Sequence, residues 1–455
     1  MHPIFRAPGS GAIPVYFIDA ASLGAERDGL DAAAWRFARA AGFEAKPGRM
    51  LVLPGKGGSG EIGGVLFGTD PVDPFAPGRL PGTLPPGTYR FVNAPDARLA
   101  ALAFALGSYQ FARYRKADER KVALELPAGV DAEDATHIIE AVFLARDLIN
   151  TPTNDMGPAE LEAAARALAT QHGGSVRSIA GDNLLSENFP LIHAVGRAST
   201  LPPRLIDLTW GNADDPKVTL VGKGVCFDSG GLDIKPSSGM LMMKKDMGGA
   251  ATVLAAAHMI MSRGLKLRLR VLIPAVENAI SGSAFRPLDV YPSRRGLTVE
   301  VGNTDAEGRL ILADALALAD EEAPDLLVDL GTLTGAARVA LGPELPAFYT
   351  NNEALAAELL AVGQQENDPF WRLPLWQPYL SMLDSKVADT NNVSSGGFAG
   401  SITCALFLSR FVSGAKAWLH FDIYAWNAAA KPGRPEGGEC QVARALYAYL
   451  CKRYA

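Results

Sequence analysis

Four carboxylates in the middle of the chain lie in glycine-rich segments, where they could do chemistry together. Asp228 precedes Ser-Gly-Gly, Asp246 precedes Met-Gly-Gly, and Asp305 and Glu307 lie in Asn-Thr-Asp-Ala-Glu-Gly-Arg. Side chains two residues apart point to the same side of an extended segment, so Asp305 and Glu307 can reach one partner. Four acids with few compensating charges would repel one another strongly if they were buried. They therefore predict a site for divalent metal ions.

Each of these residues also has an ordinary structural explanation. Asp246 suits the N-cap of a helix, and Asp305 and Glu307 suit a first helical turn, where acids complement the helix dipole. Lys223 and Lys235, in the same region, would ordinarily be solvated. For the group as a whole, the glycine flanks favour a functional site, because glycine lets the backbone approach a ligand closely.

The elements that must position these residues alternate between strands and helices from residue 135 onward. Apolar runs predict the strands, and amphipathic or Ala-rich runs predict the helices. The alternation indicates a partly parallel central sheet with helices on both faces, so that reactive loops follow the carboxyl ends of strands. The predicted strands are 217–221, 267–276, 326–330 and 418–424, and the predicted helices are 135–150, 158–172, 247–263, 309–322 and 439–452.

The N-terminal third is richer in Gly and Pro. Short strands are predicted at 15–18, 50–53 and 89–92, and a helix at 94–109. A charged stretch that contains Pro127 and Gly129 suggests a boundary near residue 130. We predict an α/β protein of two domains: a small N-terminal α/β domain (1–130) with a regulatory or oligomerisation role, and a larger C-terminal catalytic domain (131–455) with a mixed central β-sheet flanked by helices.

The composition is that of a soluble globular protein and limits its partners. The chain has 455 residues, of which 48% are hydrophobic and 20% charged, and a formal net charge of -6. This charge gives no attraction for nucleic acid or anionic membranes, so neither is expected as a partner. The N-terminus does not resemble a signal peptide, no apolar run suggests a membrane span, and the four cysteines are scattered. These features predict a cytoplasmic location.

Three further features resemble functional motifs only superficially. The segment 55–60 fits G-x-G-x-x-G, but a strand rather than a helix follows it, which predicts a hairpin turn. Cys226 follows a buried strand and is expected to be a small core residue. His420 lies on a predicted strand, where a core histidine is a simpler expectation than a metal ligand.

Three segments closely resemble the leucyl aminopeptidase (cytosol aminopeptidase) family. They are Val-Gly-Lys-Gly with Phe-Asp-Ser-Gly-Gly and Ile-Lys-Pro (221–236), Met-Lys-Lys-Asp-Met-Gly-Gly-Ala-Ala (243–251), and Asn-Thr-Asp-Ala-Glu-Gly-Arg-Leu (303–310), the last being the family's signature. The resemblance extends from about Arg146 to the C-terminus. It implies a metal-dependent aminopeptidase that releases N-terminal residues from peptides.

The resemblance implies two divalent metal ions per subunit. Asp228 and Glu307 would bridge both ions, Lys223 and Asp246 would complete the tighter site, and Asp305 would complete the exchangeable one. The family usually uses zinc, and sometimes manganese, cobalt or magnesium. The hardness of the ligands by itself favours magnesium or manganese. The sequence therefore does not determine which metal binds. Zinc and manganese are expected first, with magnesium or cobalt as alternatives.

The resemblance also implies roles for other residues. Water activated by the two metals attacks the scissile carbonyl, Lys235 stabilises the gem-diolate, and Arg309 holds a bicarbonate that acts as general base. Binding of the substrate's free α-amine by one metal explains exopeptidase action. A Met-lined pocket favours Leu or Met as the first residue. The predicted substrate-binding residues are Met243, Asn303, Thr332, Leu333 and Gly335.

The chain departs from the family pattern at three positions without losing a ligand. Lys245 stands where the family is often uncharged, which changes the polarity of the pocket; Leu288 replaces a usual Gly, and Gly331 stands where Ala is common. By resemblance the active form is a homohexamer. One alternative function is a two-metal phosphoesterase, but such enzymes usually add His ligands. The other is a catalytically altered relative that acts as a binding or regulatory protein, which would be expected to have lost one of the seven metal-binding and catalytic residues.

Overall fold

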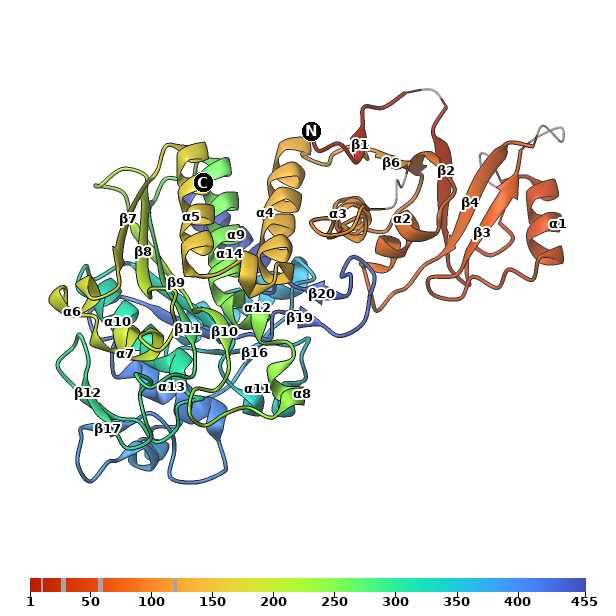
Figure 1. Cartoon of the computed structure of the whole chain (residues 1–455). Coiled ribbons are helices and arrows are strands. Elements are labelled where there is room, and N and C mark those ends of the chain that lie inside the picture. Colours follow the sequence, from red (N-terminus) through yellow and green to blue (C-terminus); the bar gives the residue numbers. More distant parts are fainter. Residues whose placement is uncertain (10, 26–29, 56–59, 118–120) are drawn as a thin grey trace. The chain divides into compact units, whose positions relative to one another are not determined.

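The computed structural model describes residues 1–9, 11–25, 30–55, 60–117 and 121–455. Contacts divide this chain into two units (Figure 1). The first comprises Met1–Phe143 and Ala428–Glu436, and the second comprises Leu144–Asn427 and Gly437–Ala455. The two-domain α/β architecture is as predicted, whereas the domain ranges 1–130 and 131–455, and the role given to the smaller domain, stay predictions.

A six-stranded sheet organises the described residues of the first unit, in the order β1-β6-β5-β2-β4-β3. Its strands are parallel except for β3, which pairs antiparallel with β4 as a hairpin requires. Residues 56–59 of that predicted turn lie outside the described residues. Tyr16, Trp35 and Leu66 belong to the apolar core beside α1. The elements are β1 (Phe5–Arg6), β2 (Ile13–Ile18), α1 (Ala32–Ala40), β3 (Met50–Pro54), β4 (Ile62–Gly68), η2 (Ala76–Arg79), α2 (Leu80–Thr83), β5 (Gly87–Phe91), α3 (Ala97–Gly107) and β6 (Val122–Glu125).

A nine-stranded mixed sheet forms the middle of the second unit, in the order β16-β15-β18-β14-β9-β11-β8-β7 with β10 paired to β11. Strands β18, β14, β9, β11 and β10 are parallel to one another, whereas β8 pairs antiparallel with β11 and β15 with β18. The strands of the unit are β7 (Ser175–Ala180), β8 (Arg204–Trp210), β9 (Lys217–Gly222), β10 (Gly224–Asp228), β11 (Arg268–Asn278), β12 (Val290–Pro292), β13 (Thr298–Glu300), β14 (Leu326–Gly331), β15 (Ala347–Tyr349), β16 (Trp371–Arg372), β17 (Thr390–Asn391), β18 (Trp418–Asp422), β19 (Trp426–Asn427) and β20 (Gly437–Gly438).

Helices cover both faces of this sheet, with α5, α9 and α14 on one face and α7, α10 and α13 on the other (Figure 1). Val221 and Leu272 of the sheet pack with Leu312 of α10 and Phe407 of α13, and burial of each such side chain contributes about 1.5–3 kcal/mol. Helix α4 (Ala132–Asn150) includes residues of both units. The other helices of the second unit are η3 (Thr153–Asp155), α5 (Pro158–His172), α6 (Asn183–Ser186), α7 (Pro190–Gly196), α8 (Ser237–Met240), η4 (Met243–Met247), α9 (Gly248–Arg263), α10 (Glu307–Asp320), α11 (Gly335–Leu341), α12 (Glu353–Gln365), η5 (Gln377–Leu383), α13 (Gly400–Ser409) and α14 (Ala443–Tyr454).

Polar side chains set helix ends that the sequence pattern misplaced. Helix α4 begins at residue 132 rather than 135, because the Asp131 carboxylate accepts hydrogen bonds from the backbone N–H groups of residues 133 and 134, at 2.9 and 3.1 Å. Helix α14 begins at residue 443 rather than 439. Its N-cap, Val442, has a positive φ of 76°, and Asp368 accepts hydrogen bonds from the backbone N–H groups of Val442 and Arg444.

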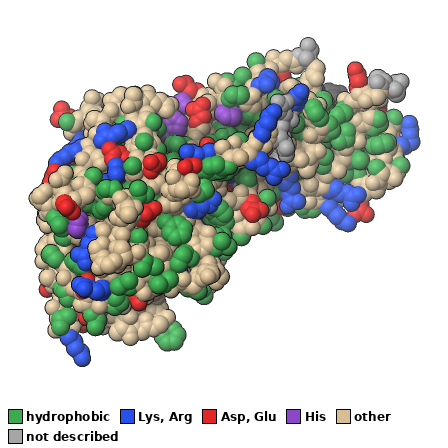
Figure 2. Space-filling view, viewed as in Figure 1, with side chains coloured by type: hydrophobic (Ala, Val, Ile, Leu, Met, Phe, Trp, Pro, Cys, Tyr) green, Lys and Arg blue, Asp and Glu red, His purple; other side chains and the backbone are tan. Residues whose placement is uncertain are grey.

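The surface carries charges of both signs. On the face shown in Figure 2, Lys and Arg side chains are interspersed with Asp and Glu side chains. This distribution gives that face no extended region of one sign. Among the described residues, no helix has both the length and the apolar character needed to cross a membrane.

Candidate active site

The five predicted metal ligands meet at the carboxyl ends of parallel strands in the second unit. Lys223 directly follows β9, Asp228 ends β10, Asp246 lies in η4, and Asp305 shortly precedes Glu307, which begins α10. Asp228, Asp305 and Glu307 each offer a carboxylate oxygen, and these oxygens lie within 4.8 Å of one another. Parallel strands end at one edge of the sheet, which explains why residues distant in sequence converge there.

Lys223 makes several contacts in this cluster and is almost completely buried. Its ammonium lies 2.7 Å from Asp246 Oδ2 and 2.9 Å from Glu307 Oε1, and it donates a 2.9 Å hydrogen bond to the carbonyl of Thr332. A Cβ on Gly308 would lie 2.6 Å from Nζ, so glycine at this position leaves room for the lysine. Burial works to lower the pKa of Lys223, but the neighbouring carboxylates outweigh it and raise the pKa.

The second lysine of the cluster, Lys235, comes from the loop that follows β10. Its ammonium lies 2.8 Å from Asp228 Oδ2 and also pairs with Asp305 Oδ1. Burial works to lower the pKa of Lys235, but its pairing with these two acids raises the pKa above the usual value. Neither Lys235 nor Lys223 is therefore an ordinary solvated lysine.

The four acids carry more charge than the two lysines compensate. Burial and the nearby Asp246 raise the pKa of Asp228 to about 6, and burial with Asp228 raises the pKa of Glu307 to about 8. Burial acts in the same direction on Asp246, but Lys223 and Lys245 hold its pKa below the usual value. A bound dication would favour the ionised form of each acid.

The donor set fits divalent metal ions. Among the described residues, the buried oxygens Asp246 Oδ2, Asp305 Oδ1 and Glu307 Oε1 face no hydrogen-bond donor other than the lysine ammonium groups. Carboxylate oxygens are the ligands that hard divalent cations prefer. A nearby dication can also deprotonate Lys223 and so make its nitrogen a ligand. The residues present can therefore hold a two-metal centre.

The helix-based explanations of the acids do not account for their positions. The N-cap of α9 is Met247, not Asp246, whose carboxylate instead accepts a 2.7 Å hydrogen bond from the Thr332 hydroxyl. Glu307 does lie in a first helical turn, but it is only 1% exposed. The extended geometry expected around Asp305 and Glu307 is wrong, because a turn leads directly into α10.

Two asparagines that the sequence analysis did not single out hold the cluster in place. Asn278, the last residue of β11, donates to Asp228 Oδ1 at 2.8 Å and to the carbonyl of Thr304 at 3.1 Å. The side chain of Asn392 donates to the carbonyl of Asn303 at 2.8 Å. No motif marks either residue. The one available signal was the position of Asn278, two residues after the predicted strand 267–276.

Arg309 and Asn303 flank the two acids of the signature segment. Arg309 is 8% exposed and donates from Nη1 to the carbonyl of Asn392 at 2.8 Å. Within the described part of the chain it forms no ion pair with a carboxylate, so donors remain for an anion. The side-chain oxygen of Asn303 accepts a 2.7 Å hydrogen bond from the backbone N–H of Asp305, so Asn303 shapes this turn.

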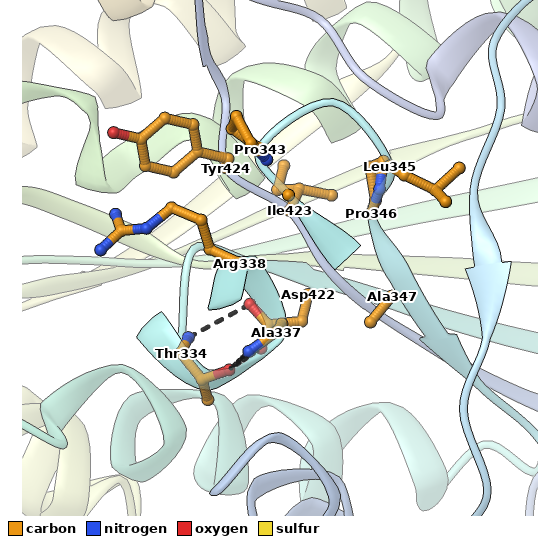
Figure 3. Close-up of a pocket in the computed structure, with 11 residues that line it drawn as sticks. Thr334, Ala337, Arg338, Pro343, Leu345, Pro346, Ala347, Asp422, Ile423 and Tyr424 are labelled. Carbon is orange, nitrogen blue, oxygen red and sulfur yellow. Dashed lines mark hydrogen bonds between the residues drawn. The ribbon is translucent and has the colours of Figure 1, made fainter. Parts of the chain in front are cut away.

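The other predicted substrate-binding residues lie on two segments beside the cluster. Met243 begins η4, Thr332 and Leu333 lie in the turn between β14 and α11, and Gly335 begins α11. Figure 3 shows Thr334, the residue before α11, hydrogen-bonded to Asp422. Asp422 accepts hydrogen bonds from the backbone N–H and the hydroxyl of Thr334 at 3.2 and 2.6 Å.

The departure at Lys245 places a second buried lysine next to Asp246. Its Nζ lies 4.5 Å from the centroid of the Tyr424 ring, and the guanidinium of Arg338 lies 5.0 Å from the same centroid. Burial lowers the pKa of Lys245 to about 8. Lys245 therefore lies inside the site region instead of on the surface.

Cys226 and His420 are core residues, as expected. Cys226 is 1% exposed, and burial raises the pKa of its thiol. His420 is fully buried, with Nδ1 2.6 Å from Asp329 Oδ1. Neither residue belongs to the group of carboxylates that could hold a metal ion.

Comparison with known families accounts for nearly the whole chain. A model of the cytosol aminopeptidase catalytic domain matches residues 143–447, and a model of the M17 aminopeptidase N-terminal domain matches residues 13–127. The chain belongs to the cytosol aminopeptidase family. It is a metal-dependent aminopeptidase, which confirms the predicted family and enzyme class.

Several cytosol aminopeptidases and related enzymes are similar over most of their length. The crystal structure of the cytosol aminopeptidase from Coxiella burnetii is 47% identical, with a TM-score of 0.95 and 100% of both chains covered. The bottromycin maturation enzyme BotP in complex with Mn is 34% identical, with a TM-score of 0.86, covering 96% of this chain and 98% of that one. A probable cytosol aminopeptidase of Roseiflexus castenholzii is 43% identical over 365 residues, which is 76% of this chain and 74% of that protein.

Proposed function

We propose that this aminopeptidase releases the first residue of peptides with two divalent ions held by Lys223, Asp228, Asp246, Asp305 and Glu307. The convergence of the acids supports the proposal, since carboxylate oxygens of three of them lie within 4.8 Å of one another. When bound, the ions supply an activated water and a contact for the free α-amine of the peptide. We propose manganese or zinc, and the Mn in the similar BotP structure supports manganese.

Lys235 and Arg309 are the proposed catalytic residues. Lys235 stays charged because of its pairing with Asp228 and Asp305, so its ammonium can stabilise the negative charge that develops on the scissile carbonyl oxygen. Arg309, in the first turn of α10, has guanidinium donors left for an anion. We propose that this anion is bicarbonate, which would supply a general base for the attacking water.

The proposed substrate site uses the turn before α11 and the beginning of η4. Met243 offers apolar, adaptable surface to a first side chain of the length of Leu or Met. The remaining proposed contacts are Asn303, Thr332, Leu333 and Gly335.

We further propose a cytoplasmic homohexamer as the working form, with the N-terminal domain serving regulation or assembly. Val339 and Phe398 of the second unit are each 86% exposed. Exposed large apolar side chains of this kind favour burial in an assembly.

Hydrolysis of leucine p-nitroanilide by metal-stripped protein, before and after addition of manganese or zinc, tests the proposed centre. Activity is expected only with metal. The Glu307→Ala variant should lose it, whereas Glu358→Ala, at an exposed position on α12, should retain it. Absence of activity on Leu, Met, Ala and Glu substrates with either metal would reject the proposal, and so would full activity of Glu307→Ala.

A further inference from the structure

Lys245 is a buried cation without a counter-ion of its own. The residue is 5% exposed, and in the described chain its ammonium takes part in no ion pair or hydrogen bond with another side chain. Its polar contact is the face of the Tyr424 ring, 4.5 Å from the ring centroid. A cation–π contact stabilises an ammonium by less than burial costs it. Among the described residues, the buried Lys245 ammonium therefore has no carboxylate partner that would offset the cost of its burial.

The two acids whose charges act on Lys245 are engaged elsewhere. Asp246 pairs with Lys223 at 2.7 Å and accepts a hydrogen bond from the Thr332 hydroxyl at 2.7 Å. Asp422 accepts hydrogen bonds from the turn before α11, including two backbone N–H groups at 3.1 and 3.2 Å and a hydroxyl at 2.6 Å. Among the described residues, neither acid forms an ion pair with the Lys245 ammonium.

A second cation lies over the same aromatic ring. The guanidinium of Arg338 is 5.0 Å from the Tyr424 centroid, and it forms no ion pair within the described residues. Figure 3 shows its side chain alongside the Tyr424 ring, with the guanidinium pointing the same way as the hydroxyl end of the ring. Two positive groups thus lie at one aromatic side chain.

Both cations come from the segments that are proposed to bind the first residue of the substrate. Lys245 is two residues after Met243 in η4, and Arg338 is three residues after Gly335 in α11. Residues three apart on a helix lie on neighbouring parts of one face. Met243, Lys245 and Arg338 therefore all come from the two segments of the proposed pocket.

We propose that this pocket selects an acidic first residue, glutamate foremost, whose carboxylate pairs with Lys245 and Arg338. Glu has the same reach as Met, so its methylene groups can lie against Met243 while its carboxylate meets the cations. This inference rests on the proposed function and on its assignment of the pocket. Under this proposal, the pocket prefers a first residue with a negatively charged side-chain end over one whose side chain is purely apolar.

The wild-type full chain loaded with manganese provides the first test. We compare kcat/KM for the p-nitroanilides of Glu and Gln, which have the same shape but differ in charge. Pairing of a carboxylate with the buried Lys245 and the nearby Arg338 predicts that Glu is favoured over Gln by about 10- to 100-fold. A ratio of one, or a preference for Gln, would overturn the inference while leaving the aminopeptidase proposal intact. Failure of these substrates together with Leu and Met would reject the proposed function itself.

Variants then assign the preference to its residues. Lys245→Met removes the charge and keeps the length of the side chain, and it should reduce the Glu-to-Gln ratio about 10-fold or more. Arg338→Gln, at an exposed position, should reduce it in the same direction. Lys266→Met, at another exposed position of the same unit, is the matched control and should leave the ratio unchanged. An unchanged ratio in both Lys245→Met and Arg338→Gln would overturn the inference.

Binding supplies a readout that does not depend on turnover. By calorimetry, the manganese-loaded wild type should bind L-glutamate more tightly than L-glutamine, and Lys245→Met should lose that difference. If circular dichroism shows that Lys245→Met does not fold, the same binding comparison is made with Arg338→Gln, which should reduce the difference between L-glutamate and L-glutamine. Equal binding of the two amino acids by the wild type would contradict the proposed pairing.

Discussion

At the scale of single residues, the two lysines of the centre have distinct electrostatic settings. Lys223 lies deep in the cluster, between Asp246 and Glu307, as a proposed ligand must. Lys235 is less buried, with a side chain that is 14% exposed, and is held by Asp228 and Asp305. Lys223, the proposed metal ligand, and Lys235, the proposed stabiliser of the developing charge, thus pair with different acids of the same cluster.

Replacement of Lys235 tests this difference. We expect Lys235→Met to lower kcat by about 10²- to 10³-fold, because a positioned donor to the developing charge is removed. The bound metal should remain near the wild-type amount, since the five proposed ligands are intact. Steady-state kinetics and elemental analysis of the purified variant measure the two quantities. Loss of metal in proportion to activity would make Lys235 a structural residue of the site instead.

At the scale of elements, α10 is fixed at both ends by carboxylates. Glu307 begins it within the acid cluster, and Asp320 ends it. The Asp320 carboxylate accepts hydrogen bonds from the backbone N–H groups of residues 413, 414 and 415 at 2.9, 2.8 and 2.8 Å. Asp320 therefore ties the end of the helix opposite Glu307 to the loop that leads into β18.

Asp320→Asn should lower the free energy of unfolding by about 1–3 kcal/mol at pH 7, since these bonds to a charged acceptor are weakened. Burial works to raise the pKa of Asp320, but the backbone donors and Arg295 hold it below its usual value of 3.8. The ionised Asp320 carboxylate therefore makes its full contribution to the free energy of unfolding above pH 3.8. This contribution is lost as the pH falls through the folded-state pKa. Urea unfolding between pH 7 and pH 3 should show that the difference in the free energy of unfolding between the wild type and Asp320→Asn becomes smaller as the pH falls. Asp214→Asn, in an exposed loop, is the control.

Leu288, where the family usually has Gly, adopts a positive φ of 70° and is 71% exposed. This backbone region costs an L-residue about 1–2 kcal/mol, and an exposed side chain regains little of it. Leu288→Gly should therefore raise the free energy of unfolding by about 0.5–1 kcal/mol after the entropic cost of glycine. Thermal and denaturant melts measure the change. Leu185→Gly, in helix α6, should lower stability and is the contrast; destabilisation by Leu288→Gly would show that Leu288 makes stabilising contacts.

At the scale of the whole molecule, the acid cluster links stability to pH and to metal. Because burial raises the folded-state pKa of Asp228 to about 6 and that of Glu307 to about 8, the metal-free protein should lose stability as pH rises from about 4 to about 8. Manganese at 100 times its Kd should restore about 2.7 kcal/mol. Melting of the stripped and loaded protein across this range tests both effects. Glu307→Gln should weaken the pH dependence, and a metal-free stability that is constant from pH 5 to 8 would contradict the account.

The local sequence was enough for some of this molecule. The strand and helix pattern predicted an α/β catalytic unit, because periodic burial is a local signal, and α5 has the predicted bounds. The glycine-flanked acids predicted a polar centre, and the family resemblance that they carry is confirmed. Their roles as metal ligands stay predictions, although the fold brings all five together.

Only the tertiary structure decided what surrounds those residues. Asn278 reaches Asp228 because β11 lies beside β10, and no sequence motif records that pairing. Lys245 could equally have been solvated; it is buried against Tyr424 because η4 packs close to the end of β18. The chemical identity of a ligand is a property of one residue, whereas burial, charge partners and pocket polarity depend on which distant strands become neighbours.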